Sequence, residues 1–168
     1  GLKGTFFGDG EGFATDLVKW QEVAKTGHEL GNGALLALLP FLDQMTPESL
    51  LEEIQSTDLL LSELTRGPGP FPLAWPIGSP KTGYPDFSFA HLSVVRTGLE
   101  GVNRELDPHR LKCIPAIDLS GSELIDVAKW AQAPGTWIIF VFEGIGEGER
   151  GIDRIAHREL LDWLSLAK

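Results

Sequence analysis

The feature that most constrains the fold is an alternation of short apolar, β-prone runs with amphipathic helical stretches, separated by glycine and proline. Such an alternation is typical of an α/β domain in which helices join parallel strands. The nearly continuous apolar run at 136–142 predicts a strand that is buried on both faces, as parallel sheets require. We therefore predict a parallel sheet or barrel whose strands lie at 2–7, 28–31, 72–75, 92–96, 111–117 and 136–142.

Helix boundaries are marked by residues that cap the first or the last turn. Ser, Thr and Asp side chains accept hydrogen bonds from the first backbone N–H groups, and glycine adopts the left-handed conformation that often ends a helix. The predicted helices start and stop at Thr15 with Gly27, at Thr46-Pro47 with Gly67, at a capping box over Ser120–Glu123, and after Asp153.

Length and composition limit the number of domains and the kinds of partner that this chain can have. The 168 residues, 42% of them hydrophobic, are enough to build one sizeable core, so we predict a single domain over residues 1–168. The 14 Lys and Arg residues against 24 Asp and Glu give a formal charge of -10. That charge opposes binding to nucleic acid and to an anionic membrane surface. A neutral or cationic partner is expected instead.

Cys113 is the single cysteine, which excludes an intrachain disulfide and a cysteine-based metal cluster and leaves the compartment open. The longest apolar run, 34–39, is far shorter than a membrane span, and no apolar leader follows a basic start. The chain is therefore expected to be soluble, either cytoplasmic or exported. It begins at Gly1 rather than Met, which indicates a processed chain, an engineered variant or a fragment.

The most informative motif is Gly-His-Glu-Leu-Gly-Asn-Gly-Ala-Leu-Leu-Ala at residues 27–37. It resembles the second motif of the polysaccharide deacetylases, the NodB-homology group also called carbohydrate esterase family 4. In that family a Gly-His-Glu-Ile/Leu-Gly-Asn segment leads into two histidines that bind a divalent metal such as zinc. The corresponding positions of this chain hold Gly33 and Ala37, which have no side-chain donor atom.

Further segments along the chain are similar to the same family. The resemblance is carried by Lys-Gly-Thr-Phe-Phe at 3–7, Leu-Ala-Trp-Pro-Ile-Gly at 73–78, Val-Arg-Thr at 95–97 and Ile-Ile-Phe-Val-Phe-Glu-Gly-Ile-Gly at 138–146. It implies a parallel-stranded, incomplete or distorted (β/α) barrel of the NodB-homology type that lacks the family's first strand. It also implies an ancestral reaction, the metal-dependent removal of an N- or O-acetyl group from a carbohydrate.

Three departures from the family pattern bear on that reaction. The first motif, Thr-Phe-Asp-Asp-Gly, which carries the general base and a metal-binding aspartate, is not in this sequence. Gly33 and Ala37 replace the metal-binding histidines, and Glu143 stands where a histidine acts as general acid. We therefore expect no metal or other cofactor in this chain, and a deacetylase-like domain that is catalytically impaired. The alternative is a non-catalytic carbohydrate-binding or scaffold domain, or an engineered or truncated variant.

In a parallel barrel, functional side chains project from the carboxyl ends of the strands. The residues at those ends form a polar ring with one aromatic member: Asp9, Asn32, Trp75, Arg96, Asp118 and Glu143. Asp9 and Glu143 are the candidate catalytic residues, as a carboxylate pair of the kind that glycosidases use. The other four are candidate substrate-binding residues, with the Trp75 indole stacked on a sugar ring.

Each member of this ring also has a structural interpretation. Asp9 lies in the sequence Gly8-Asp9-Gly10 and is typical of a turn. Trp75 is equally compatible with a core position, and Asp118 with a loop before the Ser120 cap. Glu143 has the strongest claim to a functional role, because an ionisable group at the end of an apolar strand needs a partner or water.

The predicted partner is a carbohydrate, with no nucleic acid and no membrane. The missing first strand would leave the next strand with an unpaired edge, which favours association. We therefore expect that edge to be covered by another segment or by a second copy of the chain in a homo-oligomer.

Overall fold

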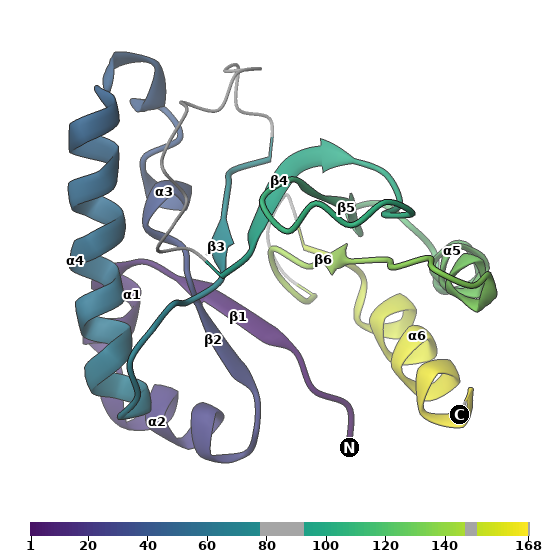
Figure 1. Cartoon of the computed structure of the whole chain (residues 1–168). Coiled ribbons are helices and arrows are strands. Elements are labelled where there is room, and N and C mark those ends of the chain that lie inside the picture. Colours follow the sequence, from purple (N-terminus) through teal and green to yellow (C-terminus); the bar gives the residue numbers. More distant parts are fainter. Residues whose placement is uncertain (78–92, 147–150, 168) are drawn as a thin grey trace. The chain divides into compact units, whose positions relative to one another are not determined.

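The computed structural model describes residues 1–77, 93–146 and 151–167 (Figure 1). Gly78 of the third family-like segment and Leu92, the predicted start of a strand, lie outside these residues. Residue contacts divide the chain into two compact units. The N-terminal unit comprises residues 3–98 and 107–111, and the C-terminal unit comprises 1–2, 99–106 and 112–168. The single domain predicted over 1–168 stays a prediction.

The described residues form both helices and parallel strands, which confirms the predicted α/β class. In chain order the elements are β1 (Thr5–Gly8), α1 (Gly10–Thr15), α2 (Leu17–Lys25), β2 (Glu29–Asn32), α3 (Ala34–Ala37), the 3-10 helix η1 (Leu42–Gln44), α4 (Pro47–Thr65), β3 (Leu73–Ala74), β4 (Val95–Glu100), β5 (Leu111–Pro115), α5 (Gly121–Lys129), the 3-10 helix η3 (Trp130–Gln132), β6 (Phe140–Val141) and α6 (Arg154–Leu166).

The strands pair in parallel and in chain order. In the N-terminal unit, β1 pairs with β2 from Thr5 opposite Glu29 to Gly8 opposite Asn32. Strand β2 also pairs with β3, and β3 pairs with β4, where Ala74 lies opposite Arg96. In the C-terminal unit, β5 pairs with β6. Helices α1 and α2 lie between β1 and β2, α3 and α4 between β2 and β3, and α5 between β5 and β6, because parallel neighbours need a long crossover connection.

The predicted helix caps are confirmed for the three later helices. Thr46 Oγ1 accepts the Ser49 N–H at 3.2 Å, and Pro47 occupies the first turn of α4. Ser120 and Glu123 form the reciprocal capping box of α5. Asp153 caps α6 through two backbone N–H groups. These interactions span three residues or fewer, so the local sequence suffices to specify them.

The first predicted helix is wrong at its start. Thr15 ends helix α1, which the sequence did not predict, and Asp16 precedes α2. Asp9 caps α1, so the glycine-rich segment that resembled a turn begins a short helix. The predicted stop is confirmed, since Gly27 follows α2 with a φ of +86°.

Two strands differ from their predicted ranges. The strand predicted over 136–142 is reduced to Phe140–Val141, and it is half-buried where the prediction had it buried on both faces. Strand β4 begins at Val95 and runs past Arg96 to Glu100. It passes through Gly98, where a Cβ would lie 2.6 Å from the Pro76 carbonyl oxygen, so glycine here permits close contact between two backbones.

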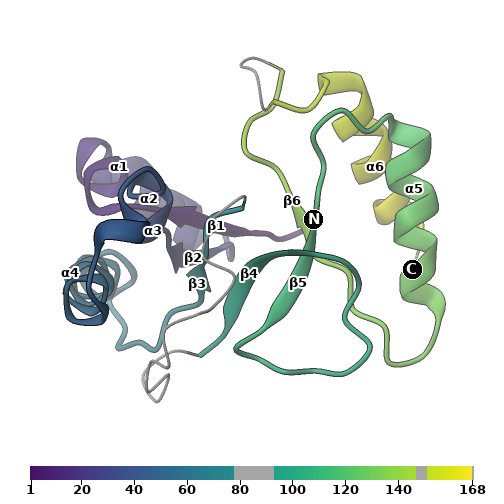
Figure 2. The ribbon, with the colours of Figure 1, turned by 90° about the horizontal axis from the view of Figure 1, so that it is seen from above.

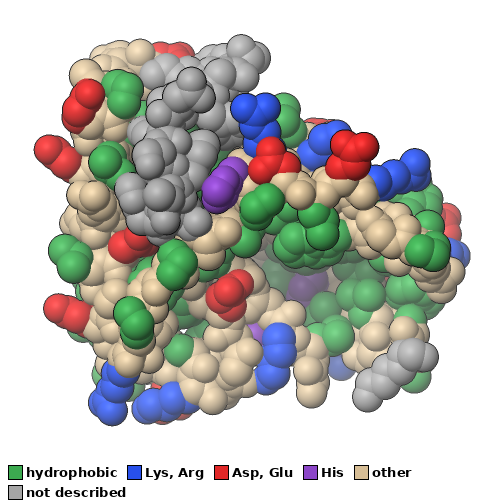
Figure 3. All heavy atoms as spheres, in the orientation of Figure 1, with side chains coloured by type: hydrophobic (Ala, Val, Ile, Leu, Met, Phe, Trp, Pro, Cys, Tyr) green, Lys and Arg blue, Asp and Glu red, His purple; other side chains and the backbone are tan. Residues whose placement is uncertain are grey.

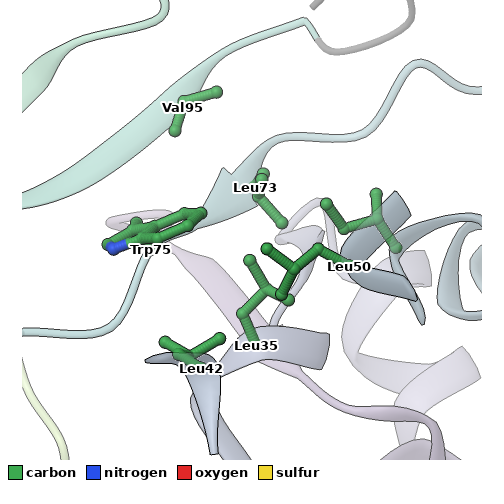
Figure 4. Close-up of a cluster of buried hydrophobic side chains, with 7 residues drawn as sticks. Leu35, Leu42, Leu50, Leu73, Trp75 and Val95 are labelled. Carbon is green, nitrogen blue, oxygen red and sulfur yellow. The ribbon is translucent and has the colours of Figure 1, made fainter. Parts of the chain in front are cut away.

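The core of the N-terminal unit consists of two apolar clusters that share helix α4. One cluster lies between α3, α4, β3 and β4, and Figure 4 shows its Trp75 indole among the aliphatic side chains. The other lies between α1, α4 and β2. The buried members of the first are Leu35, Leu42, Leu50, Ile54, Leu73, Trp75 and Val95, and those of the second are Phe13, Leu30, Leu61, Leu64 and Phe71.

The C-terminal unit has a core of its own, formed where α5 and α6 pack together (Figure 2). Its buried members are Ala116, Leu124, Ala128, Ile152, Ala156 and Leu160. Gly121 permits the close approach of the two helices, because a Cβ there would meet the side chain of Glu159. Among the described residues, no helix has both the length and the apolar character needed to cross a membrane.

Candidate functional site

The structure places the predicted site residues in both units. Asp9, Asn32, Trp75 and Arg96 belong to the N-terminal unit, and Asp118 and Glu143 belong to the C-terminal unit. Within the N-terminal unit, three of them follow or end neighbouring parallel strands, so they lie at one edge of the sheet.

Asp9 directly follows β1 and serves the start of helix α1. Its Oδ1 accepts the Gly12 N–H at 2.6 Å. A carboxylate in this position satisfies a backbone donor that has no partner in the first turn and interacts favourably with the helix dipole. This is the local role that the Gly8-Asp9-Gly10 sequence favours, and the catalytic role of Asp9 stays a prediction.

Asn32 ends β2 and is completely buried. Its Nδ2 donates to the Ile54 carbonyl at 2.8 Å and to Asp58 Oδ1 at 2.7 Å, while its Oδ1 accepts the Ala34 N–H at 3.0 Å. Both amide hydrogens are therefore used inside the protein, where they join strand β2 to helix α4. The predicted contact of Asn32 with a substrate stays a prediction.

Trp75 and Arg96 lie side by side in the interior. The indole is 2% exposed, and its neighbours in the apolar cluster cover it (Figure 4). Arg96 is 5% exposed, and its Nη1 donates to the Trp75 carbonyl at 2.7 Å and to the Thr97 carbonyl at 3.3 Å. Its guanidinium also lies 5.8 Å from the centre of the Phe7 ring. The position of Trp75 is that of a core residue, which was the alternative to a sugar-stacking platform.

Gly33 and Ala37, which the resemblance places at the metal-binding histidines of the deacetylases, have different surroundings. Gly33 is buried, and its N–H donates to the Gly8 carbonyl at 2.8 Å. A Cβ at Gly33 would lie 2.9 Å from the Gly8 backbone nitrogen and 3.0 Å from its carbonyl carbon and oxygen. Ala37, one helical turn later on α3, is exposed. The absence of a side chain at Gly33 is therefore a packing requirement of this backbone.

Sequence analysis missed this function of Gly33. The chain contains a partial signal, since Gly8 and Gly33 each follow or end a strand and neither carries a side chain. Only the pairing of β1 with β2, however, brings the two glycines together, because they are far apart in the sequence.

Asp118 and Glu143 follow the paired strands β5 and β6, so both come to the carboxyl edge of that pair. Both side chains are exposed, and Asp118 has a φ of +60°. A cavity of about 10 Å³ lies beside Glu143 and is lined by Ala116 and Ile152. This is the space of about one water molecule, so a sugar ring would have to bind at the surface.

His157 belongs to the same unit and contacts Phe142, the residue before Glu143. Its imidazole on α6 packs edge-on against Phe142, with ring centres 5.0 Å apart. Partial burial in this apolar environment lowers the pKa of His157, because desolvation disfavours the charged imidazolium. The imidazole thus serves the packing of α6 on the strand that ends beside Glu143.

In the part of the chain that the structure describes, no three His, Cys, Asp or Glu side chains are grouped closely enough to hold a metal ion. Comparison of the chain with family models, with curated proteins and with solved structures gave no match.

Gly33→Ala should destabilise the protein by about 1–3 kcal/mol, the usual cost of overpacking, because its Cβ collides with the Gly8 backbone. The matched control is Gly4→Ala, since a Cβ at Gly4 would meet no atom within 4 Å. Its effect should stay within about 0.5 kcal/mol. Urea unfolding measures both, and equal effects of the two substitutions would contradict the close approach.

The lowered pKa of His157 predicts that the protein becomes less stable as the pH is lowered. Below the ordinary histidine pKa of about 6.5, the unfolded chain binds a proton that the folded protein takes up less readily. The free energy of unfolding of the wild type should therefore fall more steeply than that of His157→Gln as the pH is lowered from 7 to 5.5. Urea unfolding at several pH values checks this, and parallel curves for the two proteins would refute it.

Proposed function

We propose that this chain is a polysaccharide-deacetylase-like domain in which the metal-dependent deacetylation of carbohydrate is impaired. The proposal rests on the resemblance of five segments to that family and is supported by the parallel order of the strands that those segments form. The finer architecture that we propose is an incomplete (β/α) barrel of the NodB-homology type.

The close contact between Gly33 and Gly8 is the observation that carries the impaired activity. In the family, a histidine at the position of Gly33 supplies an imidazole to the metal. Here the Gly8 backbone occupies the space into which any side chain at this position would extend. The main chain would have to move before an imidazole could be accommodated, so the change at this position reaches beyond the loss of one donor atom.

The remaining chemistry of the family depends on the same metal. A bound divalent ion lowers the pKa of a water molecule and polarises the acyl oxygen, while a general base and a general acid transfer protons. Gly33 and Ala37 provide no donor atom, and Glu143 supplies a carboxyl group where the family has an imidazole. These substitutions affect both the metal and the proton transfer, which favours impairment over a change of substrate.

The purified protein should hold no tightly bound zinc and should release no acetate from an acetylated chitooligosaccharide, with or without added zinc. Elemental analysis and an acetate assay measure the two quantities. One equivalent of zinc together with acetate release that a chelator abolishes would overturn the proposal.

A second candidate function is carbohydrate binding without catalysis. It is favoured by the exposed carboxylates of Asp118 and Glu143, which follow adjacent parallel strands and can accept hydrogen bonds from sugar hydroxyl groups. Such a site would use the carboxyl edge of the C-terminal unit and would need no metal.

Calorimetric titration with a chitooligosaccharide tests this candidate. The double variant Asp118→Asn/Glu143→Gln should bind at least about tenfold more weakly, because hydrogen bonds to charged groups are stronger than those to neutral ones. The control is Asp126→Asn, which removes an exposed carboxylate paired with Lys129 on α5. Unchanged affinity in the double variant, or no binding by the wild type, would exclude this site.

A further inference from the structure

A cavity in the N-terminal unit lies away from the candidate site. It has a volume of about 550 Å³ and opens at the amino ends of β2 and β3. The carboxyl-terminal ends of α2 and α4 and the segment 70–72 form its walls. Asn32 and Trp75 lie at the carboxyl ends of the same two strands, so the cavity is separate from these predicted site residues. Its volume is within the range of cavities that bind small molecules.

The floor of this cavity is part of the apolar core. Leu30, Leu64 and Phe71 line it, and they are 2%, 4% and 8% exposed. All three belong to the cluster that packs beneath α4. A ligand that enters the cavity therefore meets apolar side chains, and removing apolar atoms from water there is favourable.

The mouth of the cavity is positively charged, although the chain carries a net charge of -10. Lys25 ends α2, Arg66 follows α4, and both are exposed. Neither cation forms an ion pair within the described residues. Figure 3 shows Lys and Arg side chains at the lower left of the molecule.

The balance of charge at the mouth favours a single negative charge on the ligand. Glu29 also lines the cavity, and its Oε2 accepts the Thr5 hydroxyl at 2.6 Å. Lys25 and Arg66 together with Glu29 leave a formal charge of one positive unit. A dianion such as phosphate would be opposed by Glu29, whereas a monocarboxylate would match the excess.

Helix stabilisation is the other explanation for the two cations, because positive charges at a carboxyl terminus interact favourably with the helix dipole. That explanation accounts for their positions in the sequence. It does not involve the apolar residues that line the cavity. The combination of a cationic mouth and an apolar floor is what a ligand with one charged end and one apolar end would recognise.

We propose that this cavity binds a small amphiphilic monocarboxylate, with its apolar chain on Leu30, Leu64 and Phe71 and its carboxylate between Lys25 and Arg66. Arg66 can hold a carboxylate through two parallel N–H donors, and Lys25 adds a third donor from the opposite helix. The site is independent of the deacetylase-like function, since it uses the other end of the strands.

The test is a titration of the full chain with octanoate, followed by the NMR shifts of the Leu30, Leu64 and Phe71 backbone amides. Octanoate should give saturable shifts at these positions, and 1-octanol, which lacks the charge, should bind at least about tenfold more weakly. Lys25→Gln/Arg66→Gln should lower the octanoate affinity by about tenfold or more.

The matched control is Lys19→Gln/Arg110→Gln, which removes the same charge from cations of this unit that lie near Asp16 and Asp107 instead of the cavity. It should leave the affinity for octanoate unchanged. Equal binding of octanol and octanoate, equal losses in the two double variants, or no saturable shift at the floor residues would each overturn the proposal. A folded Lys25→Gln/Arg66→Gln protein with wild-type affinity would assign the cations to helix stabilisation alone.

Discussion

The N-terminal unit depends on the buried amide of Asn32. This one side chain donates to two groups of α4 and accepts the first N–H of α3, so it fixes a strand and two helices to one another. Leaving one of these buried groups without a partner costs about 1–3 kcal/mol, and three bonds converge here. Both apolar clusters of the unit use α4, so the position that Asn32 sets for this helix determines how each of them packs.

A second constraint acts directly beside the first. Gly33 follows Asn32, and its contact with Gly8 brings the ends of β1 and β2 together without any side chain between them. Both residues belong to the segment at 27–37 that resembles a metal-binding motif of the polysaccharide deacetylases. In this chain the Asn32 amide bonds to α3 and α4, and the Gly33 N–H donates to the Gly8 carbonyl. These bonds hold the segment in place without any metal ligand at Gly33.

The two ends of the N-terminal sheet differ in character. At the carboxyl ends of the strands, Asp9 caps a helix, Asn32 joins α4, and Arg96 donates to the backbone at Trp75. Polar groups there serve mainly the protein itself. At the amino ends, apolar core residues line a cavity and two cations stand at its mouth. Ligands of α/β proteins usually bind at the carboxyl ends of the strands, so the sequence pattern did not predict a cavity at the amino ends.

The sequence by itself determined the features that depend on neighbouring residues: the α/β alternation, the caps at Thr46, Ser120 and Asp153, and the glycine stop at Gly27. The caps and the stop depend on residues within one helical turn, and the alternation depends on the local spacing of apolar residues. Only the tertiary structure decided that Trp75 belongs to the core, that Gly33 must be glycine, and that Lys25 and Arg66 flank one cavity. These features join segments that are distant in the chain, and their contacts exist only after parallel strands have paired and α4 has packed across them.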